Sequence, residues 1–123
     1  MRLVFKDFPL AFHTLAHTAH QAARCAGAAG QYWPYHDRLF QSQPRFERAR
    51  LVAYAVELGI DRARFERCLD DRQFAAPVDE DIVQGRALGV SGTPAFFING
   101  HLLVGAQPVE NFRTVIDDLL KSR

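Results

Sequence analysis

The stretch GVSGTPAFFINGHLLVG, residues 89–105, constrains the fold of this chain more than any other part of it. Its Asn99-Gly100 pair stands between two short apolar runs, and an Asn-Gly pair in that setting is the strongest short-range signal for a β-hairpin. The sequence therefore predicts a strand over residues 95–98 and a return strand over 102–104. The Thr93-Pro94 step directly before the first strand ends the preceding loop.

The rest of the chain is predicted to be mainly helical. Apolar residues spaced three and four apart, together with glycine stops and proline starts, predict helices over residues 11–27, 31–42, 45–58, 61–70, 77–88 and 108–121. A short apolar run at residues 3–7 (LVFKD) is a strand candidate that ends before Pro9. This order of elements favours one α/β domain, rich in helix, with a small sheet that contains an antiparallel pair.

Composition is that of an ordinary globular domain and argues against several functions. The 123 residues are 48% hydrophobic and 24% charged, which is enough for one domain with a modest core. With a formal net charge of +1, the chain lacks the excess of positive charge expected of a protein that binds nucleic acid or an anionic membrane. The sequence has no run of 18 apolar residues, so no membrane span is expected. No phosphate loop or acid/base set stands out, so we expect no cofactor.

The N-terminal residues bear on localisation. Lys6, Asp7 and Pro9 interrupt the stretch where a signal peptide needs an unbroken apolar core. We therefore expect a cytoplasmic protein from the chain as written. If these residues are part of a longer precursor, a periplasmic or other extracytoplasmic location is the alternative.

Several motifs resemble one known family. The order VSGTP, strand, Asn-Gly, strand and helix resembles the last part of a thioredoxin fold, and the remaining segments resemble the DsbA-like thiol–disulfide oxidoreductases, which carry an inserted helical subdomain. VFKDFPL is similar to the family's second core strand, and QYWPYHDRLF is similar to its Gly-Lys-Phe-Trp-x-x-His-Asp segment. The resemblance implies a single thioredoxin-like domain over 1–123. The helical insertion would cover about 31–88, and a C-terminal strand–strand–helix unit about 93–121.

The departure from the family pattern concerns its chemistry. The family reaction depends on a C-x-x-C pair at the start of the first core helix, where a thiolate attacks a substrate disulfide. This sequence contains no C-x-x-C motif, and by the resemblance it begins after both the first core strand and the redox helix. We therefore expect a truncated fold with absent or weak redox activity. The alternative is a redox-inactive module that binds peptides or a partner chain, or that self-associates as a dimer.

If the central strand is missing, N–H and C=O groups of the two strands beside it have no hydrogen-bond partners. Such unpaired groups lower the stability of the fold. Three arrangements could compensate: a missing N-terminal segment, strand pairing in a homodimer, or a shift of residues 3–7 into the central place, antiparallel to 95–98. The third arrangement would put Pro9 to His13 beside Pro94. A sheet so small would still have edges to cover, so we expect a homodimer.

The resemblance also implies a binding loop. Gly92, Thr93 and Pro94 would form the loop whose backbone pairs with a bound peptide, with a cis bond before Pro94, and the substrate would be a peptide or protein thiol. The alternative is that Pro94 serves the fold alone, by ending the loop and directing the strand.

Cys25 and Cys68 lie 43 positions apart on two predicted helices. The resemblance implies that they could form a structural disulfide in the helical region, which would add roughly 3–4 kcal/mol in the chain-entropy model. Two other interpretations stay open. The cysteines could be separate, inert core residues, or weak catalytic candidates, although neither stands at a helix N-terminus.

His13, His17 and His20 are the candidate metal ligands, and they are weak ones. Their spacing places three imidazoles on one face of the predicted 11–27 helix, close enough for a metal ion. No carboxylate or cysteine follows at the matching spacing, and Arg24 on the same face repels cations. The sequence therefore favours a solvated or interface face and no metal. A nearby aromatic cluster is expected to pack the helical subdomain rather than to line a pocket: Tyr32, Trp33, Tyr35 and His36.

Overall fold

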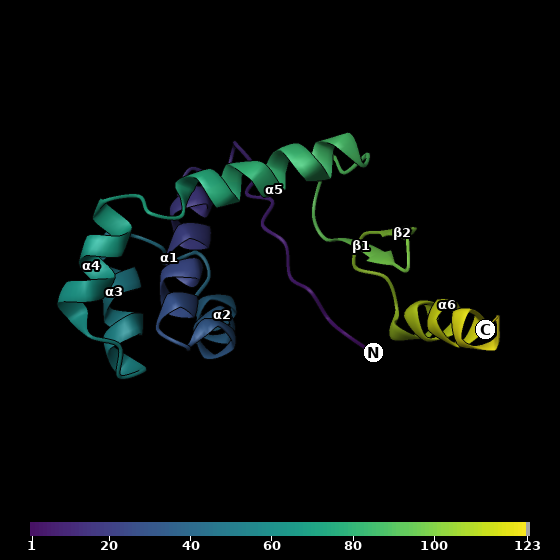
Figure 1. The fold of residues 1–123 in the computed structure, drawn as a ribbon, viewed down its shortest axis with the longest axis horizontal. Coiled ribbons are helices and arrows are strands. Elements are labelled where there is room, and N and C mark those ends of the chain that lie inside the picture. Colours follow the sequence, from purple (N-terminus) through teal and green to yellow (C-terminus); the bar gives the residue numbers. More distant parts are fainter. Residues whose placement is uncertain (123) are drawn as a thin grey trace. The chain divides into compact units, whose positions relative to one another are not determined.

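The computed structural model describes residues 1–122, which fall into two compact units, Met1–Gln84 and Gly85–Arg123. The elements along the chain are α1 (Ala16–Ala28), α2 (Tyr32–Gln41), α3 (Arg48–Glu57), α4 (Arg62–Asp70), α5 (Ala75–Ala87), β1 (Ala95–Ile98), β2 (His101–Val104) and α6 (Val109–Lys121) (Figure 1).

The first unit is built around α1. This helix contacts α2, α3 and α4, and α3 contacts α2 and α4 in turn. Ala22 and Ala26 of α1 are fully buried, and such short side chains allow the neighbouring helices to approach closely. The largest buried side chains of the core are Tyr35 and Phe65, whose ring centroids lie 5.6 Å apart. The Tyr35 hydroxyl donates to the Leu51 carbonyl at 2.8 Å, so its buried polar group is satisfied.

Three helices begin two or more residues away from their predicted starts. The first starts at Ala16 rather than at residue 11, because residues 10–16 form turns of the i to i+3 kind, such as His13 N–H to the Leu10 carbonyl. α3 starts at Arg48 for two reasons. The chain turns at Pro44, and the backbone of Glu47, the residue just before the helix, is extended. α5 starts at Ala75, two residues before Pro77, since a proline in the first turn removes no helical hydrogen bond.

The strand predicted over residues 3–7 is wrong. These residues have no strand structure, and the sheet of the described residues contains β1 and β2 alone. The proposed shift of residues 3–7 into the central place of the sheet is therefore wrong as well. Asp7 explains the difference: its backbone N–H donates to Asp81 at 2.9 Å and its carboxylate binds Arg24, so the segment is fixed by polar contacts to helices rather than by a ladder.

The second unit consists of a hairpin and a helix. Antiparallel pairing joins Ala95 to Val104 and Ile98 to His101 at its two ends. Asn99 and Gly100 connect the strands with φ of 48° and 85°, and two successive positive φ values are what a two-residue type I′ turn requires. The Phe96 ring meets Phe112 of α6 edge to face at 4.7 Å. None of the described residues of this unit is fully buried.

Candidate functional site

The loop of the predicted binding site lies between α5 and β1. The helix stops at Ala87, and Gly89 follows with φ of 91°, a conformation that a residue with a Cβ rarely adopts. Thr93 and Pro94 are exposed, Gly92 is half-buried, and the Thr93–Pro94 peptide bond is cis. The Pro94 carbonyl accepts from the Gly105 N–H at 2.9 Å, which ties the loop to the end of the hairpin.

The edge of β1 that faces away from β2 carries unpaired backbone groups within the described sheet. Hydrogen-bonded and non-hydrogen-bonded pairs alternate along an antiparallel ladder. Since Pro94 bonds to Gly105, and Ile98 and His101 flank the two-residue turn, the N–H and C=O groups of Ala95 and Phe97 point to the free edge. An edge of this kind is a template for a further strand.

The two cysteines are joined in the first unit. The Cys25 and Cys68 sulfurs are 2.08 Å apart, so a disulfide links α1 to α4, and no free cysteine remains in the described chain. The interpretation of two separate thiols is therefore wrong. Both residues are buried, with 4% and 7% of their surface exposed.

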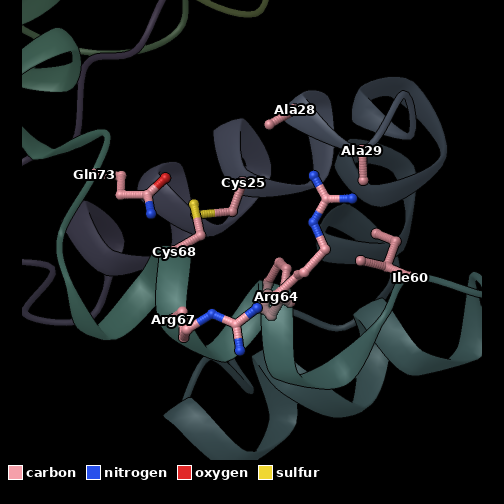
Figure 2. A pocket seen from close by; sticks show the side chains of 9 residues that line it. Cys25, Ala28, Ala29, Ile60, Arg64, Arg67, Cys68 and Gln73 are labelled. Carbon is pink, nitrogen blue, oxygen red and sulfur yellow. A yellow bond between two sulfur atoms is a disulfide. The ribbon is translucent and has the colours of Figure 1, made fainter.

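A cavity of about 180 Å³ lies beside this disulfide. In Figure 2, Gln73 lies to the left of the disulfide and Arg67 below it, whereas the Arg64 side chain lies to the right and extends toward Ala28 and Ala29. The remaining lining comes from four apolar residues: Ala28, Ala29, Ile60 and Phe65. Nothing in the sequence pattern predicted this cavity, although the spacing of four between Arg64 and Cys68 on one helix places both residues on the same face.

The three histidines do not converge on one site. His13 lies before α1, and its ring meets Phe12 edge to face with 4.4 Å between centroids. His17 Nε2 lies 2.7 Å from Asp79, and His20 Nδ1 donates to Asp7 at 2.7 Å. Each of these two rings is thus occupied by a carboxylate from another part of the chain. Among residues 1–122, no group of three or more histidine, cysteine or acidic side chains is arranged to hold a metal ion.

Asp7, His20, Arg24 and Asp81 form a polar cluster that the sequence did not indicate. Arg24 bridges the two carboxylates, with Nε 2.6 Å from Asp7 and Nη2 2.9 Å from Asp81. Burial by itself raises the pKa of Asp7, but the hydrogen bonds from His20 and Arg24 outweigh it, and the pKa lies below the ordinary value of 3.8. Asp7 is therefore a buried carboxylate that stays ionised at neutral pH.

The aromatic cluster is only partly core. Tyr35 is fully buried, as expected for packing of the helical subdomain, and burial raises its pKa. Trp33, by contrast, is 44% exposed, and its ring lies 5.1 Å from His36. Phe5 of the N-terminal segment packs edge to face on His36 at 4.8 Å. This cluster therefore helps to hold the N-terminal segment against α2 at Phe5.

None of the described helices combines the length and the apolar character needed to cross a membrane.

Comparison with known proteins identifies a family and two similar folds. The family model of the DSBA-like thioredoxin domain matches residues 3–117. The crystal structure of the thiol-disulfide exchange protein alpha-DsbA2 from Wolbachia pipientis is similar at a TM-score of 0.83 and 23% identity, covering 94% of this chain and 64% of that chain. A thioredoxin-like oxidoreductase from Silicibacter pomeroyi DSS-3 gives a TM-score of 0.85 at 23% identity, covering 97% and 68%. At this identity the two structures establish a shared fold.

Curated relatives share more sequence but are much longer. The Na(+)/H(+) antiporter NhaA 1 of Salinispora arenicola is 38% identical over 111 residues, which is 89% of this chain and 17% of that protein. The Na(+)/H(+) antiporter NhaA of Herminiimonas arsenicoxydans is 32% identical over 117 residues, which is 95% of this chain and 18% of that protein. The chain thus spans less than a fifth of the length of these relatives.

Proposed function

Because this chain belongs to the DSBA-like thioredoxin domain family, we propose that it binds an extended peptide segment at Gly92, Thr93 and Pro94 and along the free edge of β1. The predicted α/β fold of the thioredoxin-like DsbA type is confirmed by the family match and by the two solved structures. The family is one of thiol–disulfide oxidoreductases. In our proposal this sequence contributes client binding, and any exchange in the client uses a cysteine other than its own two.

The state of the two cysteines carries this proposal. An attacking thiolate must be deprotonated and accessible, whereas Cys25 and Cys68 are bonded to each other and less than a tenth exposed. A folded or unfolded protein client is too large to bring its own disulfide into contact with sulfurs buried between α1 and α4. Catalysis of exchange in clients by Cys25 or Cys68 is therefore not part of the proposed function.

The geometry of β1 supports the binding of a peptide. An extended segment that pairs with the outward N–H and C=O groups of Ala95 and Phe97 would gain main-chain hydrogen bonds whatever its sequence. The exposed Phe97 side chain offers apolar contact to such a segment. Thr93 and Pro94, which are also exposed, would present the loop backbone at one end of the same edge.

Binding is tested with a client that carries no reactive thiol. Ribonuclease A that has been reduced and alkylated is an unfolded probe of this kind. Titration followed by NMR should shift the amide resonances of residues 92–98 more than those of α3 and α4. Phe97→Pro removes the outward N–H but leaves the bonds to β2, so it should weaken binding more than Phe97→Ala does. Equal binding by both variants would contradict pairing at this edge.

A second assay tests the redox part of the proposal. With dithiothreitol as the reductant, the protein should not accelerate insulin reduction beyond the rate of dithiothreitol alone. Acceleration that is lost in a variant with both cysteines replaced by alanine would contradict the proposal, because it would make Cys25 and Cys68 a catalytic pair.

Self-association is a second candidate function, and it was also expected from the sequence. The free edge of β1 could pair with the same edge of another copy, and three exposed apolar side chains of the hairpin favour such contact: Phe97, Leu102 and Val104. Sedimentation equilibrium of the wild type and Phe97→Pro separates the two candidates. A dimer that dissociates in the proline variant would support self-association, and a wild-type monomer would exclude it.

The disulfide also bears on the compartment. Disulfides form and persist in oxidising environments and are rare in reducing ones. We therefore infer that this sequence works in an extracytoplasmic compartment rather than in the cytoplasm. The redox state of Cys25 and Cys68 after rapid alkylation of intact cells would test this location, and two alkylated cysteines would contradict it.

A further inference from the structure

The cavity beside the Cys25–Cys68 disulfide carries positive charge that the described residues do not neutralise. Both acidic side chains within α4 are bound to other arginines: Glu66 lies 3.6 Å from Arg62, and Asp70 lies 2.7 Å from Arg48. In residues 1–122, no carboxylate forms an ion pair with the two arginines that line the cavity, Arg64 and Arg67.

One helix supplies both arginines and one of the two cysteines that line the cavity. Arg64 precedes Cys68 by four residues on α4, so the two side chains lie on one face of the helix. Asp61 caps the helix by accepting from the backbone N–H of Arg64 at 2.9 Å, a contact that leaves the guanidinium group available. Arg67, Gln73 and the disulfide complete the polar part of the lining (Figure 2).

The size of the cavity decides which thiol can reach the disulfide. About 180 Å³ is less than most drug-sized ligands occupy, but it admits the arm of a small molecule that ends in a thiol. The low exposure of both cysteines excludes a protein thiol from the same place. Two guanidinium groups at the cavity select for a carboxylate, with which they form charge-assisted hydrogen bonds.

We propose that this cavity binds the carboxylate of a small anionic thiol, which reduces the Cys25–Cys68 disulfide in the folded protein. The proposal does not rest on peptide binding, because every residue it uses lies in the first unit. It gives the chain a redox-responsive site separate from the Gly92–Pro94 loop.

The reaction balances with two molecules of the thiol. The first thiolate forms a bond to Cys25 Sγ and breaks the Sγ–Sγ bond, so that Cys68 leaves as a thiolate at a cavity whose two arginines favour an anion. A second thiolate attacks the thiol sulfur of this mixed disulfide and displaces the Cys25 thiolate. The products are the oxidised small-molecule disulfide and two cysteine thiolates, which take protons from water. Two electrons pass from the two small thiols to the protein.

The test compares two thiols that differ in a single charge. N-acetylcysteine carries a carboxylate, and its methyl ester does not. The oxidised protein is incubated with each under native conditions, free protein thiols are alkylated, and their mass shift is followed with time. After correction for thiolate concentration, the anionic thiol should react roughly tenfold faster, because opposite charge at the cavity raises its local concentration. Added salt should reduce that ratio.

Variants assign the selectivity to the cavity. Arg64→Gln with Arg67→Gln should bring the ratio of the two rates close to one. Arg62→Gln is the matched control, since Arg62 is an exposed arginine of the same helix that is paired with Glu66 and does not line the cavity. A selectivity that survives in the double variant, or that Arg62→Gln also removes, would overturn the proposal.

Reduction through unfolding gives a different result. If the disulfide is reached only when the first unit opens, the rates saturate with thiol concentration at one value that is the same for both thiols. That outcome would overturn the proposal. Fluorescence of Trp33, the single tryptophan of the chain, shows whether each variant keeps the folded first unit.

Discussion

The two units of this chain keep their shapes by different means. In the first unit, fully buried side chains such as Tyr35 and Phe65, a disulfide and a buried carboxylate fix four packed helices and the N-terminal segment. In the second unit, no described residue is fully buried, and the hairpin depends on the local geometry of Asn99 and Gly100 and on the contact between Phe96 and Phe112. The first unit thus has a core of its own, whereas the apolar side chains of the second unit are at most half-buried.

The largest difference should appear when an aromatic side chain is truncated in each unit. Phe65→Ala removes a ring that is 2% exposed and leaves a cavity, so the free energy of unfolding should fall by about 3–5 kcal/mol. Phe97→Ala removes a ring that is 43% exposed, and the loss should be under about 1 kcal/mol. Urea unfolding followed by Trp33 fluorescence measures the first unit, because Trp33 lies on α2.

Phe65→Ala and Phe97→Ala form a matched pair that can contradict this contrast between the two units. Both substitutions are Phe to Ala, so the side-chain atoms removed are identical and only their surroundings differ. If Phe97→Ala shifts the Trp33 transition as far as Phe65→Ala does, the apolar side chains of the hairpin contribute to the core of the first unit and the contrast is wrong.

Loss of the disulfide should have the next largest effect, again on the first unit alone. Cys25 and Cys68 are 43 residues apart, and closing a loop of that length is worth about 3–4 kcal/mol in the chain-entropy model. Replacing both by alanine should lower the urea midpoint of the Trp33 transition by the corresponding amount. Amide chemical shifts of residues 95–104 should stay unchanged. A midpoint that does not move would show that the disulfide adds nothing to the stability of the four helices.

The sequence predicted the second unit more completely than the first, for a physical reason. The hairpin is specified by neighbours in sequence, since Asn99-Gly100 alone selects the turn, and its two strands and following helix are confirmed. The failed strand at residues 3–7 depends on Asp7, whose partners Arg24 and Asp81 are 17 and 74 residues away. No periodicity in a single sequence reports contacts of that separation.

The candidate sites also divide into those that a local sequence motif indicates and those that depend on contacts between distant residues. The loop at Gly92–Pro94 followed from a local motif and a family resemblance, and its role in binding stays a prediction. The pairing of Cys25 with Cys68, and the carboxylates that occupy His17 and His20, needed the packed helices to be known. The sequence alone could have indicated that Arg64 and Cys68 lie on one face, because both belong to a predicted helix and are four residues apart.

A smaller effect is expected from the buried carboxylate, and it should depend on pH. Asp7→Asn removes the charge that binds Arg24 and His20, so the first unit should lose about 2 kcal/mol at neutral pH. The folded pKa of Asp7 is lowered, so its stabilisation is present above the ordinary value of 3.8 and is lost as the pH falls through the folded pKa. Wild-type stability should therefore decline more steeply below about pH 4 than that of Asp7→Asn.

The control for this carboxylate is Asp37→Asn. Asp37 is an exposed carboxylate of the same unit, 3.0 Å from His36, and its loss should cost under about 0.5 kcal/mol. Urea unfolding of the three proteins between pH 3 and 7 gives the slopes. Parallel slopes for wild type and Asp7→Asn would contradict a role of Asp7 in the acid sensitivity of the first unit, whatever the loss at neutral pH.

The smallest effect on the Trp33 transition should come from the turn of the hairpin, where the two units differ most clearly. Gly100 has φ of 85° with no other group within 4 Å of a Cβ built on it, so Gly100→Ala meets no clash and is opposed only by its backbone conformation. That strain costs about 1 kcal/mol, which is a large fraction of the stability of a short hairpin without a buried residue. The stability of the helical core should not change. The amide shifts of residues 95–104 should therefore move toward unpaired values, while the Trp33 midpoint stays within experimental error.

Gly30→Ala is the matched control, because Gly30 has a similar φ of 77° and equally open surroundings but belongs to the first unit. This variant should lower the Trp33 midpoint and leave the amide shifts of the hairpin unchanged. If both variants move the same probe, the two units unfold together and the distinction between a core-stabilised and a turn-stabilised region does not hold.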